Sequence, residues 1–134
     1  MTSPSPADFH APIIDRNALI QRMMGSTEMA KRMLYRFIET CPEEYDLIES
    51  TVRLGDKETV AWIAHRHKGT AHTMASSRVA EVAAELERRA HEDSVSELLG
   101  LVEQLRSLHR EVQQFVREEF PESENPTDRN RKCP

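Results

Sequence analysis

Residues 64–72 read AHRHKGTAH and hold the side chains of this sequence that are best suited to chemistry. Three of the six histidines of the chain fall within this segment, beside one arginine, one lysine and one glycine. An imidazole can ligate a metal, act as a base or accept a phosphoryl group near neutral pH. The choice among these roles depends on the element that carries the histidines and on which of them face solvent.

The spacing of apolar residues predicts a helix over residues 57–73. On a helical wheel of about 100° per residue, His67 falls on the core face, so we expect a core histidine whose hydrogen bonds are satisfied. His65 and His72 are expected to face solvent. The core face consists of Val60, Ile63, Ala64, His67, Ala71 and Met74. The other side consists of His65, Ala61, Lys68, Gly69 and His72.

The elements that position this helix are predicted to be helices as well. An aromatic content of 5%, only four glycines and abundant Ala, Leu, Glu and Arg favour an all-α protein. Long amphipathic segments joined by short turns predict an antiparallel up-and-down four-helix bundle with a short N-terminal helix. Pro42 lies inside one segment, so we expect a kink near Cys41 or two abutting helices there. The predicted helices cover 15–24, 27–54, 57–73, a segment between breaks at 75–77 and 91–93, and a last one from the capping box Ser94–Glu97 to before Pro121.

The length of the chain suits one domain with one core. Both ends are polar and contain several prolines. We therefore expect a flexible N-terminal arm over residues 1–13, the bundle over 14–120 and a disordered C-terminal tail over 121–134. Trp62 is expected to lie partly in the core, at the edge of the bundle.

Charge and composition argue against several classes of partner. Eighteen basic and 23 acidic side chains give a net charge of −5, which disfavours nucleic-acid binding. No apolar stretch approaches the ~20 residues that span a bilayer, and the N-terminus lacks the basic and apolar regions of a signal peptide. Cys41 and Cys133 form no disulfide framework, so a reduced, cytoplasmic monomer is the expected state.

Metal binding and hydrolytic catalysis are two alternative roles for the histidines. His65 and His72 lie about 10.5 Å apart along the predicted helix axis, and His65 and His67 point about 160° apart. Neither pair can share a metal, and although other histidines could contribute, no metal site is expected. A nucleophile could have partners from distant segments, but the sequence contains no nucleophile elbow and no glycine loop.

His65, Lys68 and Gly69 together suit a phosphoryl group. A histidine with an ordinary pKa of about 6.5 is mostly unprotonated at pH 7, and it is therefore nucleophilic. Lys68 lies one turn later on the same side, where its ammonium could neutralise phosphate charge. Gly69 inside a helix costs about 1 kcal/mol relative to alanine. Either close helix packing or room for a bulky partner at His65 explains that cost, and the position of Gly69 favours the second.

The segment Ala64-His65-Arg66-His67-Lys68-Gly69-Thr70-Ala71 resembles the A-H-x-[apolar]-K-G-[small]-[small] signature of histidine-containing phosphotransfer (HPt) domains. The resemblance covers residues 14–118. The family usually has Leu or Ile at the position of His67 and often has Gly at that of Ala75. Further similar landmarks are Phe37-Ile38-Glu39-Thr40-Cys41-Pro42, Leu54-Gly55-Asp56, Val79-Ala80 and Leu86-Glu87.

The resemblance implies a phosphorelay carrier. By this resemblance His65 is the phospho-acceptor, Lys68 assists the phosphate, Gly69 clears space, and the docking side includes Ala61 and His72. The histidine would take a phosphoryl group from a receiver-domain aspartate of a hybrid sensor histidine kinase and pass it to a response-regulator receiver. The chain would have no ATP site and no cofactor of its own, since the Mg²⁺ would belong to the receiver.

Two other functions remain open at this point. One is a degenerate bundle that docks a receiver or another partner without carrying phosphate. The other is a metal-binding bundle, which added zinc would stabilise. The starting methionine and the two polar ends favour a free-standing carrier over the excised end of a hybrid kinase.

Overall fold

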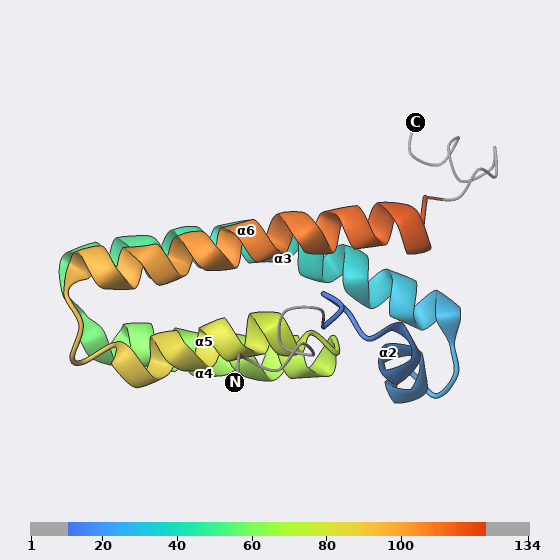
Figure 1. Cartoon of the computed structure of the whole chain (residues 1–134), viewed down its shortest axis with the longest axis horizontal. Coiled ribbons are helices and arrows are strands. Elements are labelled where there is room, and N and C mark those ends of the chain that lie inside the picture. The colour runs from blue at the N-terminus through green and yellow to red at the C-terminus, as the bar shows by residue number, and fades with distance from the viewer. Residues whose placement is uncertain (1–10, 123–134) are drawn as a thin grey trace, which may run out of the picture.

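The computed structural model describes residues 11–122, and every regular element in this range is a helix. The prediction of an all-helical protein is therefore confirmed. Most of the predicted N-terminal arm and C-terminal tail lies outside the described residues. The helices are α2 (Arg16–Arg22), α3 (Thr27–Leu54), α4 (Lys57–Thr73), α5 (Ser77–Arg89) and α6 (Val95–Glu119) (Figure 1).

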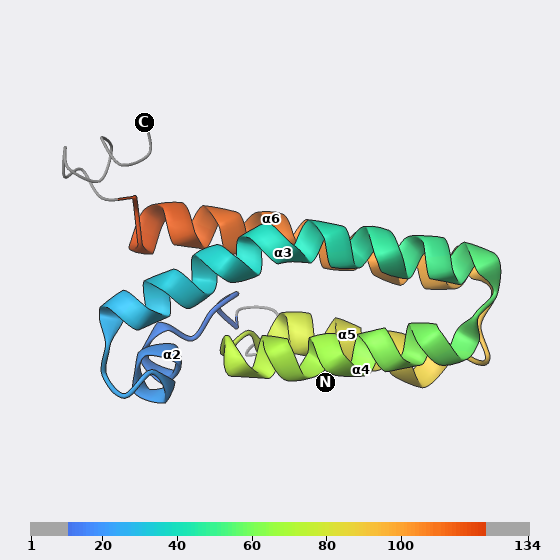
Figure 2. The same cartoon turned by 180° about the vertical axis from the view of Figure 1, so that it is seen from behind.

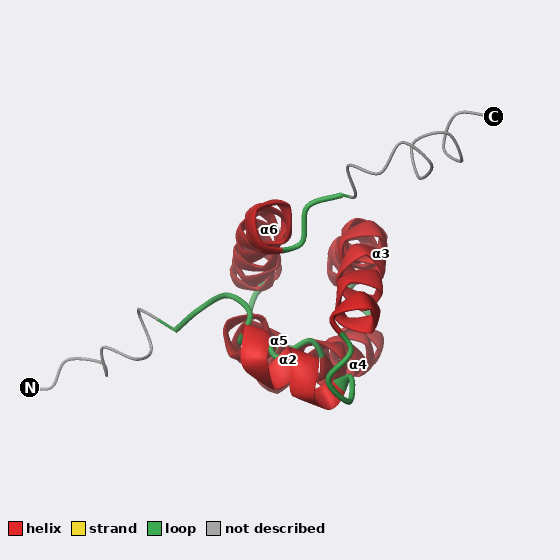
Figure 3. Cartoon of the chain, turned by 90° about the vertical axis from the view of Figure 1, so that its right-hand side faces the viewer, coloured by secondary structure: helices red, strands yellow, loops and turns green. Residues whose placement is uncertain are grey.

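The four longer helices form a bundle around one apolar core. Each packs on two neighbours, because α3 contacts α4 and α6 while α5 contacts α4 and α6. The end-on view shows α3 and α6 above, with α4 and α5 below them, and α2 lies at one end of the bundle, where it contacts α3 (Figure 3). Among the largest fully buried side chains are Leu34, Tyr45, Ile48, Ile63, Leu86 and Leu105.

The limits of α4 follow from local signals at both of its ends. Gly55 ends α3 in the left-handed region at φ 78°, and the Asp56 side chain then accepts a hydrogen bond from the Thr59 amide. At the other end, Ser76 caps α5 by accepting from the amide of Val79. The signals at Gly55 and Asp56 are the ones that the sequence predicts for the start of α4. The histidines of α4 lie in one continuous helix.

Pro42 lies inside α3 without dividing it, so the structure selects the kink rather than two abutting helices. Proline cannot donate the helix hydrogen bond to the carbonyl four residues earlier, which here belongs to Ile38. Figure 2 shows the N-terminal part of α3 bent toward α2 relative to the rest of the helix. A proline is the usual cause of such a bend.

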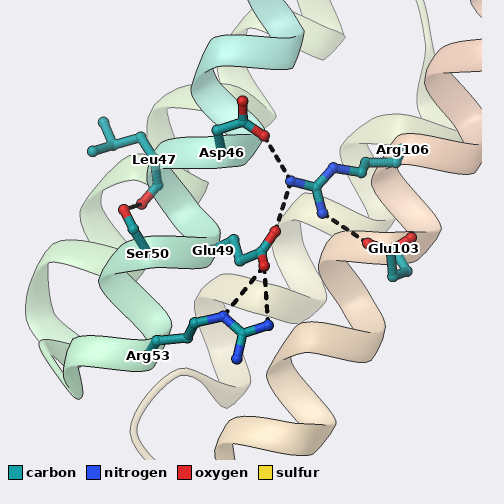
Figure 4. A network of polar contacts seen from close by, with 7 residues as sticks. All are labelled: Asp46, Leu47, Glu49, Ser50, Arg53, Glu103 and Arg106. Atoms are coloured by element: carbon teal, nitrogen blue, oxygen red, sulfur yellow. Dashed lines mark hydrogen bonds and ion pairs between the residues drawn. The ribbon is translucent and has the colours of Figure 1, made fainter.

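A network of charged side chains ties α3 to α6 on the outside of the bundle (Figure 4). The Arg106 guanidinium lies 2.9 Å from a carboxylate oxygen of Asp46, 2.8 Å from Glu49 and 2.7 Å from Glu103. Glu49 also accepts two hydrogen bonds from Arg53. Isolated surface ion pairs contribute little, but a shared guanidinium fixes the register of two helices.

Within residues 11–122, two residues other than glycine adopt the left-handed conformation, Met24 at φ 57° and Ala75 at φ 62°. Ala75 follows the end of α4, which explains why glycine is common at this position in the family that the sequence resembles. A residue other than glycine in the left-handed region destabilises the folded state by about 1–2 kcal/mol.

We expect Met24→Gly to raise the free energy of unfolding by about 0.5–1 kcal/mol, since the Met24 side chain is exposed and glycine relieves the strain. Ala75→Gly is the matched control, because Ala75 is buried and loses a methyl group worth about 0.8 kcal/mol. The free energy of unfolding of Ala75→Gly should therefore stay close to that of the wild type. Urea denaturation of the two variants measures both values, and a destabilised Met24→Gly would contradict the strain argument.

Candidate functional site

Helix α4 presents its histidines to different surroundings, as the wheel predicts. The His65 side chain is 64% exposed, whereas that of His67 is 1% exposed. Gly69 and His72 are exposed along the same side as His65, and Ala61 is partly buried against the core. The side of α4 that carries His65 is therefore open to a partner.

The Glu87 carboxylate of α5 holds two of the candidate site residues at once. One of its oxygens lies 2.9 Å from His65 Nδ1, and the other lies 3.0 Å from Lys68 Nζ. Partial burial acts to raise the pKa of Glu87, but the hydrogen bonds from Lys68 and His65 outweigh it, so this pKa is lowered. The carboxylate thus stays ionised and keeps both contacts at neutral pH.

The Glu87 contact determines which nitrogen of His65 is nucleophilic. An ionised carboxylate can only accept hydrogen bonds, so His65 Nδ1 must carry the proton. In the neutral imidazole, Nε2 then holds the free lone pair. Nδ1 is bound to α5, so Nε2 is the nitrogen that is available to an incoming electrophile.

Gly69 leaves open space beside His65. A Cβ atom built at this position meets no heavy atom within 4 Å. Close packing of a neighbouring helix therefore does not explain this glycine. Of the two explanations from the sequence, room for a partner at His65 is the one that remains.

Glu87 is the site residue that the sequence analysis missed. Its segment, Glu85 to Arg89, reads as an ordinary solvated helix face. Nothing in the sequence says that α5 turns Glu87 toward α4, because that depends on the packing of the two helices. Lys68 is paired with Glu87, so it must exchange this carboxylate for any phosphoryl group that it assists.

The expectation for Trp62 is wrong. Its side chain is 62% exposed rather than partly in the core, and the Arg66 guanidinium lies over its ring, 4.8 Å from the centroid. The helical wheel already indicates this, since Trp62 lies about 60° from His65 and nearly opposite the core face; only its apolar character suggested the core. The backbone carbonyl of His72 accepts a hydrogen bond from Arg22 of α2.

His67 is a satisfied core histidine, as the sequence predicts. Its Nδ1 lies 2.7 Å from a Glu44 oxygen, and its Nε2 lies 2.8 Å from the Tyr45 hydroxyl. Its ring also stacks on Phe37 at 5.9 Å between centroids. Both ring nitrogens therefore have partners on α3.

Within residues 11–122, no group of three or more His, Cys, Asp or Glu side chains is placed to hold a metal ion. His109 is buried, and burial lowers its pKa. Cys41 is buried as well, and burial raises the pKa of its thiol to about 12. His91 is exposed in the turn after α5, and His10 lies outside the described residues.

None of the described helices has the length and apolar character needed to cross a membrane.

The comparison with protein families agrees with this site. The model of the Hpt domain family matches residues 32–115, which is more than half of the chain. No curated protein and no solved structure matches the chain significantly. The chain belongs to the Hpt domain family, whose members are phosphocarrier modules. The matched range includes His65, Lys68, Gly69 and Glu87.

Proposed function

We propose that this chain is a phosphorelay carrier that accepts a phosphoryl group on His65 from a receiver-domain aspartate and passes it to a response-regulator receiver. The carrying observation is that His65 is exposed while its Nδ1 is tied to Glu87, which leaves Nε2 free. Lys68 on the same carboxylate and the open space at Gly69 support the same assignment. The proposal includes an antiparallel up-and-down order of the four long helices.

The bonds, protons and charges of the transfer step balance with the groups of this site and of the receiver. The Nε2 lone pair attacks phosphorus, the bond between phosphorus and the aspartyl oxygen breaks, and the aspartate leaves as a carboxylate. The imidazole keeps its Nδ1 proton and gains positive charge, which Glu87 offsets through a charge-assisted hydrogen bond. Lys68 then moves from Glu87 toward the phosphoryl oxygens. Positioning and charge stabilisation are sufficient for such a step.

The partners follow from this chemistry. The donor is the receiver of a hybrid sensor histidine kinase, and the acceptor is a response-regulator receiver. The chain itself binds no ATP, and the Mg²⁺ of the reaction belongs to the receiver. The proposed docking side surrounds His65 and includes Ala61 and His72. The carrier acts as a monomer in the cytoplasm.

Phosphotransfer from a receiver charged with acetyl phosphate tests the proposal. Several receivers should be tried, because pairs differ in specificity. Label on this chain that is labile to acid and stable to alkali is the expected result. No label with any receiver, while one of them still binds, would instead favour a bundle that docks without carrying phosphate. Unchanged thermal stability on addition of zinc would rule out the metal-binding bundle.

We expect Glu87→Gln to slow phosphoryl acceptance about tenfold, since a hydrogen bond to a charged group contributes about 1.5–3 kcal/mol and part of it is gained in the transition state. Glutamine keeps the size and can still accept from Nδ1, so the fold is preserved. Single-turnover transfer measures the rate, and Glu81→Gln, an exposed carboxylate on the same helix, is the control. Equal rates for Glu87→Gln and the wild type would remove Glu87 from the mechanism.

A further inference from the structure

Trp62 is the feature of α4 that the transfer step does not use. It is the one tryptophan of the chain, and it is 62% exposed. Within residues 11–122 it is the only aromatic side chain in the exposed class, and its indole N–H makes no hydrogen bond with the described residues. An exposed tryptophan whose N–H has no partner lowers solubility and is typical of interfaces. A role in binding would explain why a tryptophan is found at this position.

Trp62 lies beside the proposed acceptor. It precedes His65 by three residues, which places it about 60° around the helix and about 4.5 Å along the axis. A partner that brings a phosphoryl group to His65 Nε2 must therefore cover the Trp62 ring as well. Three large apolar side chains of α3 are exposed as well, Met29, Leu47 and Leu54.

A chain of contacts that begins in the core holds the Trp62 ring in place. His67 Nδ1 lies 2.7 Å from one oxygen of Glu44, and the other Glu44 oxygen lies 2.5 Å from the Arg66 guanidinium. That guanidinium in turn covers the Trp62 ring. Burial acts against the Glu44 carboxylate, but hydrogen bonds from His67 and Arg66 lower its pKa, with that from His67 the largest influence. The buried histidine thus supports a surface tryptophan through two side chains.

The charge of α4 indicates the kind of partner. This helix carries three lysine or arginine side chains against one glutamate, whereas the whole chain has a net charge of −5. Two of these cations, Arg66 and Lys68, are paired with Glu44 and Glu87, and they can exchange these carboxylates for those of a partner. An acidic surface is complementary to such a patch and is steered toward it. Rigid tryptophan and arginine side chains next to each other are typical of the residues that dominate binding energy.

Resting on the proposed function, we infer that Trp62, held by Arg66, Glu44 and His67, is the anchor that determines which receivers dock. The matching receiver has an apolar recess beside its acidic phosphorylation site, and the indole fills this recess as the aspartyl phosphate meets His65. Receivers with a bulky or charged side chain at that place are rejected. His67 is in this sense a positioning residue for docking.

Binding and labelling measured separately test the inference. Binding is measured by calorimetry with purified receiver domains in the beryllofluoride form, which mimics the phosphorylated aspartate. Labelling of His65 is measured with phosphoramidate, a small donor that needs no docking surface. We expect Trp62→Ala to lose about 30-fold or more in receiver affinity while phosphoramidate still labels it as the wild type. Leu54→Ala, a comparably exposed apolar side chain at the end of α3, should bind normally.

Two further variants test the supporting chain. His67→Leu and Glu44→Gln should each weaken receiver binding about threefold and increase acrylamide quenching of the Trp62 emission, which a purely structural role in the core would not change. Trp62→Phe should recover part of the affinity, and circular dichroism verifies that each variant folds. Quenching equal to that of the wild type in both supporting variants would remove His67 and Glu44 from the inference.

The outcomes separate this inference from the proposed function. Wild-type affinity for Trp62→Ala would overturn the anchor while leaving the carrier intact. A wild-type chain that neither phosphoramidate nor any receiver labels would overturn the carrier, yet a loss of binding in Trp62→Ala would still support the anchor. If no receiver binds, or if Trp62→Ala changes only the self-association of the chain, the receiver is not the occupant and the inference fails.

Discussion

We expect His65→Gln to abolish acid-labile phosphorylation of this chain by every receiver, with no loss of fold. Glutamine has nearly the length of histidine and can donate to Glu87, but it offers no nucleophilic lone pair at the position of Nε2. The side chain is 64% exposed, so its replacement leaves the core untouched. Radiolabel transfer beside a thermal denaturation curve measures both effects, and we expect label below detection with an unchanged melting temperature.

The matched control for this prediction is His72→Gln. His72 is exposed on the same side of α4, two turns after His65, but its side chain makes no contact with Glu87 or Lys68. Because His72 belongs to the proposed docking side, the control is read with phosphoramidate, a donor that needs no docking surface, and we expect His72→Gln to accept phosphate from it as the wild type does. Nitrogen-15 spectra of the loaded wild type should place phosphorus on Nε2 with Nδ1 still protonated. Label that survives in His65→Gln and disappears in His72→Gln would move the acceptor two turns along the helix.

Gly69→Leu is expected to slow transfer at least about 100-fold, since a displacement of about 1 Å between reacting groups costs that much. A side chain at this position projects beside His65, into the space that the structure leaves open. The same change should raise the free energy of unfolding by about 0.5–1 kcal/mol, because leucine is a better helix former than glycine. Greater stability together with lost transfer would separate a docking role from a folding role.

Gly100→Leu is the control for Gly69→Leu. Gly100 is also exposed inside a helix, and a Cβ there likewise meets no heavy atom within 4 Å. It belongs to α6, which packs mainly on α3 and α5 rather than on α4. We expect the same gain in stability with an unchanged transfer rate. If Gly69→Leu transferred as fast as Gly100→Leu, close approach over Gly69 would be excluded as the reason for this glycine.

Local sequence determined the helices and the candidate acceptor. The caps at Asp56 and Ser94, the left-handed Gly55 and the apolar spacing of α4 all act within a few residues, so they can be read without tertiary information. The same spacing separates exposed His65 from buried His67. The placement of Lys68 and Gly69 one turn beyond His65 likewise follows from helical geometry alone.

Contacts between helices decided which carboxylates reach the residues of α4. Glu87 meets His65 and Lys68 only because α5 packs on α4 in one register and at one rotation, which no local pattern specifies. The same reason applies to Glu44, which reaches His67 and Arg66 from α3. Trp62, by contrast, lies on the exposed face of α4 about 60° from His65, so helical geometry alone places it in solvent. The exposed candidate histidine and the tryptophan beside it can thus be placed from the sequence, but the carboxylates that contact their surroundings, Glu87 and Glu44, depend on how neighbouring helices pack.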